Sequence, residues 1–340
     1  MTAIPMTAAT FAPDLCTDYH LAQVDSWPKS VHRFDDDSVW AVRTALASGR
    51  PLLVRGEPGI GKSQLARAVA SYFGVPFLSF VVNARSECSD LLYSHDAVSR
   101  LAQAQVLSHA NAAENWRAEL AEERYVRPGK LWWAVNWTDA VAQAKLWCRS
   151  CGQDADSDCC TSCGEPEHSR LPDWGHGGGC VLLIDEIDKA DSDFPNGLLE
   201  SLGNTGFEVE SARRSVQPEG VPPLVVVTTN EERELPAAFL RRCLVLAMVF
   251  PDEDQQQFLA DRGHIHFPDL GAAVCTRAAD LVLGERGKQS AALSRPGTAE
   301  FLDILRALHT LYGRDMAAQL GAIDQVSRFS LRKNPQALRR

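Results

Sequence analysis

The feature that most constrains the fold is a glycine-rich loop between a short apolar strand and a helical segment. In "RPLLVRGEPGIGKSQLARAVASYFG", the apolar run Leu52–Val54 precedes the loop, and a pattern of helical period follows it. This strand–loop–helix context is the one in which G-x-x-x-x-G-K-S binds phosphate, because backbone N–H groups and the helix N-terminus surround the anion. The candidate phosphate-binding residues are Gly56, Glu57, Pro58, Gly59, Ile60, Gly61, Lys62, Ser63 and Gln64.

Two side chains of this loop have separate expected roles. Lys62 supplies a positive charge at the β- and γ-phosphates, and the hydroxyl of Ser63 is expected to bind Mg²⁺. The loop therefore predicts a site for a nucleoside triphosphate with its magnesium ion.

A second strand, in "GCVLLIDEIDKAD", ends in two carboxylates. The run Val181–Ile184 is continuously apolar, as expected of a strand buried on both sheet faces. Asp185 and Glu186 follow at its carboxyl end, where α/β sheets bind their ligands. We expect Asp185 to hold Mg²⁺, directly or through water, and Glu186 to act as the general base that polarises the attacking water.

Polar residues also follow a third apolar run, "PLVVVTTNEE", and a helical stretch in "ELPAAFLRRCLVLAMVFPD". Asn230 at the end of the third run is placed to position the water and sense the γ-phosphate, although a simple turn residue is the alternative reading. Arg241 and Arg242 come just before another apolar strand. On spacing alone, a pair of arginines in this place is more often surface charge.

The order "GEPGIGKS", "VLLIDEID", "VVVTTN" and "LPAAFLRRC" resembles the AAA+ ATPases, and the longer text resembles their MoxR branch over residues 35–310. The resemblance implies an α/β fold: a three-layer α/β/α P-loop domain with a parallel sheet and a small C-terminal helical lid. It implies hydrolysis of ATP with Mg²⁺. It also makes Asn230 the sensor-1 residue, Arg242 the arginine finger offered to a neighbouring subunit, and Arg295 in "LSRPGTAEFLDILRAL" the sensor-2 arginine.

The predicted organisation has four parts, with two insertions implied by the resemblance. They are an N-terminal arm at 1–30, a nucleotide-binding core at 31–250, a helical lid at 251–325 and a basic tail at 326–340. One insertion interrupts the second helix at about 91–133, as a hairpin projecting toward the pore. The other lies in "GFEVESARRSVQPEGVPP". Tyr125, Trp132 and Trp133 are expected to pack in the core, with a grip on a polypeptide as the alternative.

Four cysteines form a separate metal-binding pattern at about 145–170. The spacing C-x₂-C-x₈-C-x₂-C predicts a closed tetrahedral zinc site of four thiolates, which leaves no open position for catalysis. The alternatives are Cys159 in place of Cys160, His168 or His176 as a ligand, and an iron–sulfur cluster. The predicted zinc ligands are Cys148, Cys151, Cys160 and Cys163.

Charge and hydropathy limit the partners. The net charge of −10 argues against nucleic-acid binding by the whole surface, although the zinc pattern and the basic tail keep a nucleic-acid-directed motor as the alternative. A scaffold that hydrolyses nothing is a further alternative. No export signal or membrane-spanning run is recognisable, so we expect a cytoplasmic protein with reduced cysteines and no membrane contact. The resemblance implies a homo-oligomeric ring, expected to be a hexamer, and a remodelled protein partner such as a von Willebrand factor A protein.

Overall fold

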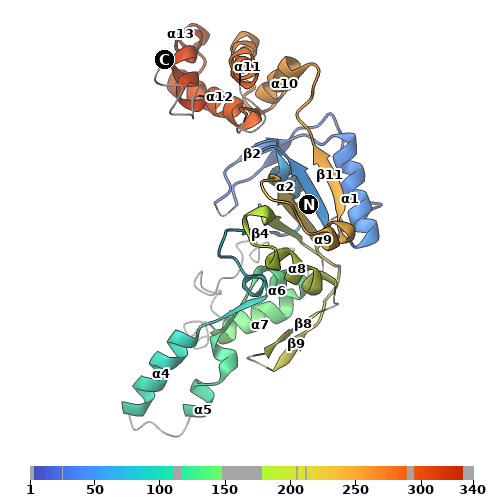
Figure 1. The fold of residues 1–340 in the computed structure, drawn as a ribbon, viewed down its shortest axis with the longest axis vertical. Coiled ribbons are helices and arrows are strands. Elements are labelled where there is room, and N and C mark those ends of the chain that lie inside the picture. The colour runs from blue at the N-terminus through green and yellow to red at the C-terminus, as the bar shows by residue number, and fades with distance from the viewer. Residues whose placement is uncertain are drawn as a thin grey trace. The chain divides into compact units, whose positions relative to one another are not determined.

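The structure, a computed structural model, describes residues 4–24, 26–109, 116–147, 178–203, 206–210, 213–288 and 295–331 (Figure 1). Its contacts divide the chain into two units. The first, here called the sheet unit, comprises Met1–Asp14, Asp35–Val54 and Ala66–Leu246. The second, the lid unit, comprises Leu15–Phe34, Arg55–Leu65 and Ala247–Arg340. The phosphate loop therefore groups with the C-terminal helices, which a linear division of the chain does not anticipate.

A five-stranded sheet has the order β11-β3-β10-β7-β4. Strands β10 and β4 both run parallel to β7, and Leu224 and Phe77 both pair with Val181. Every residue of β7 and β10 is buried, and each strand begins with four consecutive apolar residues, as burial on both sheet faces requires. The strands are β3 (Leu52–Gly56), β4 (Phe77–Val81), β7 (Val181–Asp185), β10 (Leu224–Thr229) and β11 (Leu244–Met248).

Several helices of the sheet unit pack with the strands around an apolar core. Helix α1 begins at an N-cap, Asp35, whose side chain accepts a hydrogen bond from the Ser38 amide. Trp132 and Trp133 are fully buried in the core and Tyr125 is 2% exposed, in agreement with the expectation that these aromatics pack inside. The helices are α1 (Asp36–Ser48), α2 (Lys62–Phe73), α6 (Lys130–Val135), α7 (Trp137–Trp147), α8 (Asp193–Gly203) and α9 (Ala237–Arg242).

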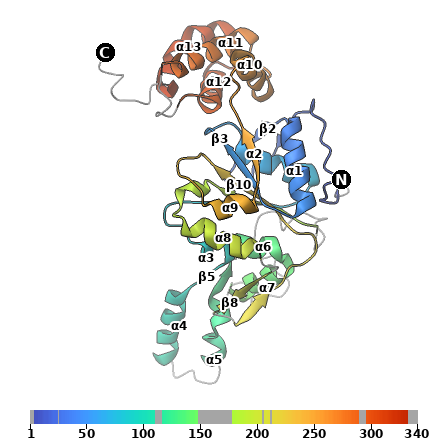
Figure 2. The ribbon, with the colours of Figure 1, turned by 45° about the vertical axis from the view of Figure 1, so that its right-hand side comes forward.

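The first insertion is built on a short antiparallel stem. Strand β5 (Tyr93–His95) pairs with β6 (Val126–Pro128). Helix α4 extends from this stem (Figures 1 and 2). Its large exposed apolar side chains are those of Val98, Leu101 and Val106. The other elements here are α3 (Cys88–Leu92), α4 (Ala97–His109), α5 (Trp116–Glu119) and the 3₁₀ helix η1 (Glu122–Tyr125).

The second insertion is a hairpin tied to helices α6 and α7. Strands β8 (Phe207–Val209) and β9 (Arg214–Val216) pair antiparallel. One carboxylate oxygen of Asp139 on α7 accepts hydrogen bonds from Trp132 Nε1 and Arg214 Nη2, both at 2.8 Å. Arg214 also lies over the Trp132 ring, with its Cζ 5.1 Å from the ring centre. The hairpin is thus fixed to the core through one buried tryptophan.

The lid unit contains a bundle of C-terminal helices with its own core. Phe301, Ile304 and Leu305 of α12 pack there with residues of the other helices. Helix α13 extends to Leu331, because Ile323, Ser327 and Leu331 recur every four residues on its buried face. The helices and strands that lie wholly in this unit are β1 (Tyr19–Leu21), β2 (Ser30–His32), α10 (Gln255–His266), α11 (Ala272–Arg286), α12 (Thr298–Tyr312) and α13 (Met316–Leu331).

The predicted zinc ligands Cys148, Cys151, Cys160 and Cys163 lie outside the described residues, as do their rivals Cys159, His168 and His176. Among the residues that are described, no group of three or more His, Cys, Asp or Glu side chains is arranged to hold a metal ion. The described helices also include none that is long and apolar enough to cross a membrane.

Candidate active site

The phosphate loop connects β3 to α2, as its sequence predicts. Gly59 and Gly61 have φ values of 78° and 112°, a region that favours glycine. A Cβ placed on Gly59 would collide with the Cβ of Ala299 at the start of α12. Glycine is therefore required at this position for the loop and the helix to approach closely. At the other end of the loop, the Gln64 side chain accepts a hydrogen bond of 2.9 Å from Ser30.

Lys62 is the cation of this loop. Its side chain is buried, and its Nζ donates to the backbone oxygens of Gly56 at 2.7 Å and Glu57 at 3.0 Å. The ammonium lies within the loop and is bonded to these two backbone carbonyls. It can exchange these bonds for the stronger ones that phosphate oxygens offer.

Two arginines of the lid helices lie at the phosphate loop. Arg286, the last residue of α11, donates from Nη2 to Glu57 Oε1 at 2.7 Å and from Nη1 to the Pro296 oxygen at 3.1 Å. Its guanidinium also lies 4.3 Å from the centre of the Phe250 ring, and only 12% of its side chain is exposed. Arg262 Nη1 lies 3.7 Å from where a Cβ on Gly61 would stand.

The predicted sensor-2 residue has a different environment. Arg295 is exposed, two residues before the N-cap Gly297 of α12. No described contact joins it to the loop. Sequence reasoning missed Arg286, because its "GERGK" context matches no motif and its contact with Glu57 spans more than 200 positions of the chain.

Asp185 lies at the carboxyl end of β7, beside a threonine of the neighbouring strand. Thr228 Oγ1 donates to Asp185 Oδ1 at 2.5 Å, and the Glu186 amide donates to Thr228 Oγ1 at 2.9 Å. The single hydroxyl thus orients the carboxylate and fixes the backbone of the next residue. Thr228 was not predicted; its position inside an apolar strand, opposite the acidic pair, is the signal that could have found it.

Glu186 and Asn230, two of the predicted site residues, lie within hydrogen-bond distance of each other. Asn230 Nδ2 donates to Glu186 Oε1 at 3.2 Å, and Lys189 Nζ donates to Glu186 Oε2 at 2.5 Å. Glu186 has φ 60° and ψ 48°, the left-handed conformation that few non-glycine residues adopt. Such a conformation persists only where the surroundings hold it, and it is common at functional sites.

The buried carboxylate of Asp188 holds together the two segments that carry Glu186 and Asn230. Asp188 is 2% exposed and accepts hydrogen bonds from the backbone N–H of Asn230 at 3.3 Å and the backbone N–H of Glu232 at 2.9 Å. It therefore ties the turn after β7 to the end of β10. Its place in "DEID" is visible in the sequence, but its partners are not.

The expected finger residue lies at the end of α9. The side chain of Arg242 is exposed, while its backbone oxygen accepts a hydrogen bond of 3.1 Å from Arg50 Nε. Arg50 also donates to the oxygens of Arg241 and Cys243. The backbone that presents Arg242 is thus fixed, and the guanidinium faces solvent.

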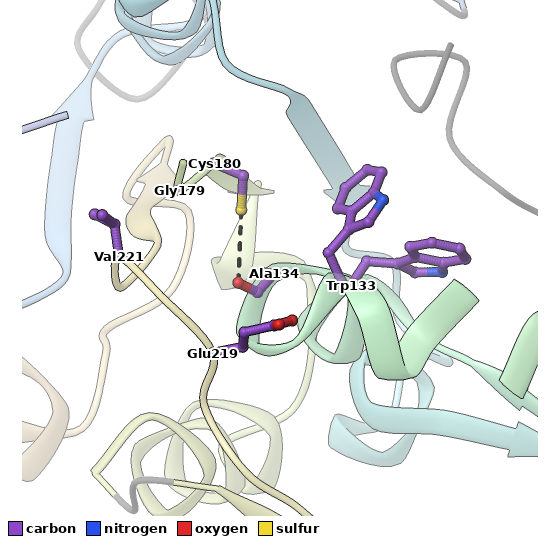
Figure 3. Close-up of a pocket in the computed structure, with 7 residues that line it drawn as sticks. Trp133, Ala134, Gly179, Cys180, Glu219 and Val221 are labelled. Atoms are coloured by element: carbon purple, nitrogen blue, oxygen red, sulfur yellow. Dashed lines mark hydrogen bonds between the residues drawn. The ribbon is translucent and has the colours of Figure 1, made fainter. Parts of the chain in front are cut away.

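A small cavity lies elsewhere in the sheet unit, next to helices α6 and α7 (Figure 3). Its volume of about 10 Å³ is at the lower limit for one water molecule, so it holds no organic substrate. Cys180 Sγ points toward the Ala134 oxygen at 3.8 Å, and burial raises the pKa of this thiol to about 12. The residues that line it are Trp133, Ala134, Trp137, Gly179, Cys180, Glu219 and Val221.

Comparison with known proteins places the chain in a family. The profile of the AAA domain family, dynein-related subfamily, matches residues 51–243, which is more than half of the 340 residues. Two structures of Thermotoga maritima RuvB variants are similar at 14% and 15% identity, with TM-scores of 0.43 and 0.41. These alignments cover 85% and 84% of this chain and 68% and 66% of the RuvB chains. No match was found among curated proteins.

The chain belongs to the AAA domain family, dynein-related subfamily, with the three-layer α/β P-loop fold. It is an ATPase of the AAA+ class. The matched segment runs from the strand before the phosphate loop to the residue after Arg242, so it contains all four motifs on which the sequence resemblance rests.

Proposed function

We propose that this chain is a Mg²⁺-dependent, MoxR-like AAA+ ATPase that assembles into a hexameric ring and remodels a protein partner. The observation that carries the hydrolytic part is the carboxyl end of β7. There Asp185 and Glu186 stand side by side, oriented by Thr228 and Asn230. A strand that only completed a sheet would need no such network of oriented carboxylates.

In this proposal the phosphate loop binds the nucleotide through its backbone amides and Lys62. Ser63 and Asp185 hold Mg²⁺, which neutralises phosphate charge when bound. Glu186 accepts a proton from water as the water oxygen bonds to the γ-phosphorus. The bond from that phosphorus to the bridging oxygen breaks, and its electron pair leaves on ADP. Asn230 orients the water and the base.

In this proposal the arginines that act on the nucleotide come from the lid and from a neighbouring subunit. Arg242 acts on the nucleotide of the next subunit, which its exposed position at the end of α9 allows. Of the two lid arginines, we assign the role at the phosphate loop to Arg286, because it contacts Glu57, and we retain Arg295 as the competitor that the sequence nominates.

A protein partner fits the surface better than nucleic acid does. The net charge is −10, and helix α4 exposes the apolar side chains of Val98, Leu101 and Val106. A von Willebrand factor A protein is the partner implied by the MoxR resemblance. Proteins that co-purify with a Glu186→Gln trap identify the partner, and recovery of DNA or RNA in place of protein would contradict the proposal.

Two substitutions test the chemistry. Lys62→Ala removes the charge opposite the β- and γ-phosphates, so we expect it to abolish ATP binding. Glu186→Gln removes the base but leaves the proposed magnesium ligand Asp185, so we expect ATP binding near the parental affinity and loss of hydrolysis by a factor of about 10² or more. Calorimetry measures binding, and phosphate release measures turnover. Hydrolysis at the parental rate by Glu186→Gln would show that another group is the base.

A further inference from the structure

The carboxylate of Glu186 is held on both of its oxygens. Oε1 accepts from Asn230 Nδ2 at 3.2 Å, and Oε2 accepts from Lys189 Nζ at 2.5 Å. A general base must offer an oxygen to the water whose proton it takes, within about 2.6–3.2 Å. Each oxygen already has one donor from this chain, so a water that reaches Glu186 has to use the remaining lone pair of an oxygen that is already bonded.

The local backbone brings Lys189 to this carboxylate. Glu186 is the N-cap of the 3₁₀ helix η4 (Ile187–Lys189), and its own oxygen accepts the Lys189 amide at 3.0 Å. The turn is anchored by Ile187, which is fully buried, and by Asp188 with its two amide donors. The Lys189 side chain therefore lies against Glu186, three positions earlier. Both partners of the ion pair come from the same turn of the chain.

Lys189 carries a positive charge beside Glu186, and the ion pair between them is partly exposed to solvent. The hydrogen bond to Glu186 raises the pKa of Lys189, and the charges of Glu232 and Asp188 raise it further, so the ammonium stays protonated at neutral pH. The side chain is 41% exposed and that of Glu186 is 30% exposed. An ion pair of this exposure contributes little to stability and can open.

We propose that Lys189 is a positioning residue that restrains Glu186. It takes one lone pair of Oε2 and holds the carboxylate in place, and its departure opens that side of the oxygen to the attacking water. Asn230 is not expected to leave Glu186 in the same way. Its backbone N–H donates to Asp188, and its side-chain amide is expected to orient the water. The inference rests on the proposed role of Glu186 in ATP hydrolysis.

The test is the basal ATPase rate of the full chain with Lys189→Met, which keeps the length of the side chain and removes its charge. We expect kcat to rise about threefold, the factor that loss of a partly exposed ion pair allows, with KM for ATP changed less than about twofold. Lys189→Arg restores a donor to Oε2 and is expected to return to the parental rate. A merely structural lysine would not give this split between kcat and KM or this rescue.

The matched control is Lys288→Met. Lys288 Nζ donates to Glu285 at 2.8 Å with the same spacing of three residues, but in the lid unit. We expect its turnover to equal that of the parent. Thermal melting of each variant shows whether a changed rate comes from lost folding.

A second measurement does not depend on turnover. In the parent, NMR titration of the lysine Nζ groups should give Lys189 a pKa above the ordinary 10.5, and Glu186→Gln should return it toward 10.5. An unchanged pKa, or a Lys189→Met enzyme that is as slow as the parent or slower, overturns the restraint. If the full chain hydrolyses no ATP, the proposed function fails as well. If the full chain hydrolyses ATP and the Lys189→Met variant shows no rise in kcat, the proposed restraint alone is wrong.

Discussion

At the scale of single residues, Arg286 and Arg295 compete for one role. Arg286 is 12% exposed and pairs with Glu57 inside the phosphate loop, whereas Arg295 is exposed. A carboxylate beside bound phosphates repels them unless a cation neutralises it. The Arg286 guanidinium does this in the structure, and from its place at the loop its N–H groups can donate hydrogen bonds to a phosphate oxygen.

We therefore expect Arg286→Ala to raise the dissociation constant for ATP about threefold to fivefold, since the Glu57 charge is left unpaired. Arg295→Ala should change it less than about twofold. Calorimetric titration with ATP measures both. Adding Glu57→Gln to Arg286→Ala should recover part of the affinity, because the unpaired charge is gone. A larger loss with Arg295→Ala would return the role to the residue that the sequence nominates.

At the scale of elements, the two insertions differ in how they are held. The β8–β9 hairpin is tied to the core by Arg214, Asp139 and Trp132. Helix α4 stands on the β5–β6 stem with Val98, Leu101 and Val106 exposed. Exposed apolar side chains gathered on one helix favour the binding of another protein. They suit the protein partner of the proposed function.

The segment at about 145–170 contains the four cysteines of the predicted zinc site. We propose that Cys148, Cys151, Cys160 and Cys163 bind one zinc ion per chain, and we expect the purified protein to contain it in that ratio by elemental analysis. Thiolates are required as ligands, so replacing Cys148 and Cys151 by serine should release the metal. ATP binding should remain, because the phosphate loop lies elsewhere in the chain. A preparation with no zinc, or zinc retained by the serine variant, would rule out this ligand set.

At the scale of the whole molecule, the proposed ring places Arg242 on a neighbour's nucleotide. An arginine that stabilises charge in the transition state acts on turnover more than on binding, and in other phosphoryl-transfer systems it is worth about 10³–10⁵ in rate. We expect Arg242→Ala to bind ATP almost as well as the parent and to hydrolyse it very slowly.

Mixing separates a finger that acts on a neighbour from one that acts on its own subunit. Lys62→Ala subunits lack a binding site but still offer Arg242, so adding them to Arg242→Ala subunits should restore part of the activity. The ATPase rate is followed across mixing ratios, with assembly measured by light scattering. Mixed assemblies with no recovered activity at any ratio would contradict action on a neighbour. Full activity of Arg242→Ala alone would remove the residue from the site.

The sequence by itself determined the P-loop class of fold and the AAA+ family, because the motifs are local. "GEPGIGKS" needs only a strand before it and a helix after it, and a continuous apolar run such as Val181–Ile184 needs only a sheet that covers both faces. The burial of Trp132 and Trp133 also followed from their residue type. Local patterns of this kind carry their own physical cause within about ten residues.

Only the tertiary structure decided which side chains act on one another. Lys189 and Glu186 meet because Glu186 takes a left-handed conformation, which no sequence pattern here required. Thr228 reaches Asp185 because β10 pairs with β7 in one particular register. Arg286 reaches Glu57 through the packing of the lid helices. Each contact joins groups whose separation depends on strand register or helix packing, and those are set by the summed burial of many side chains rather than by any local motif.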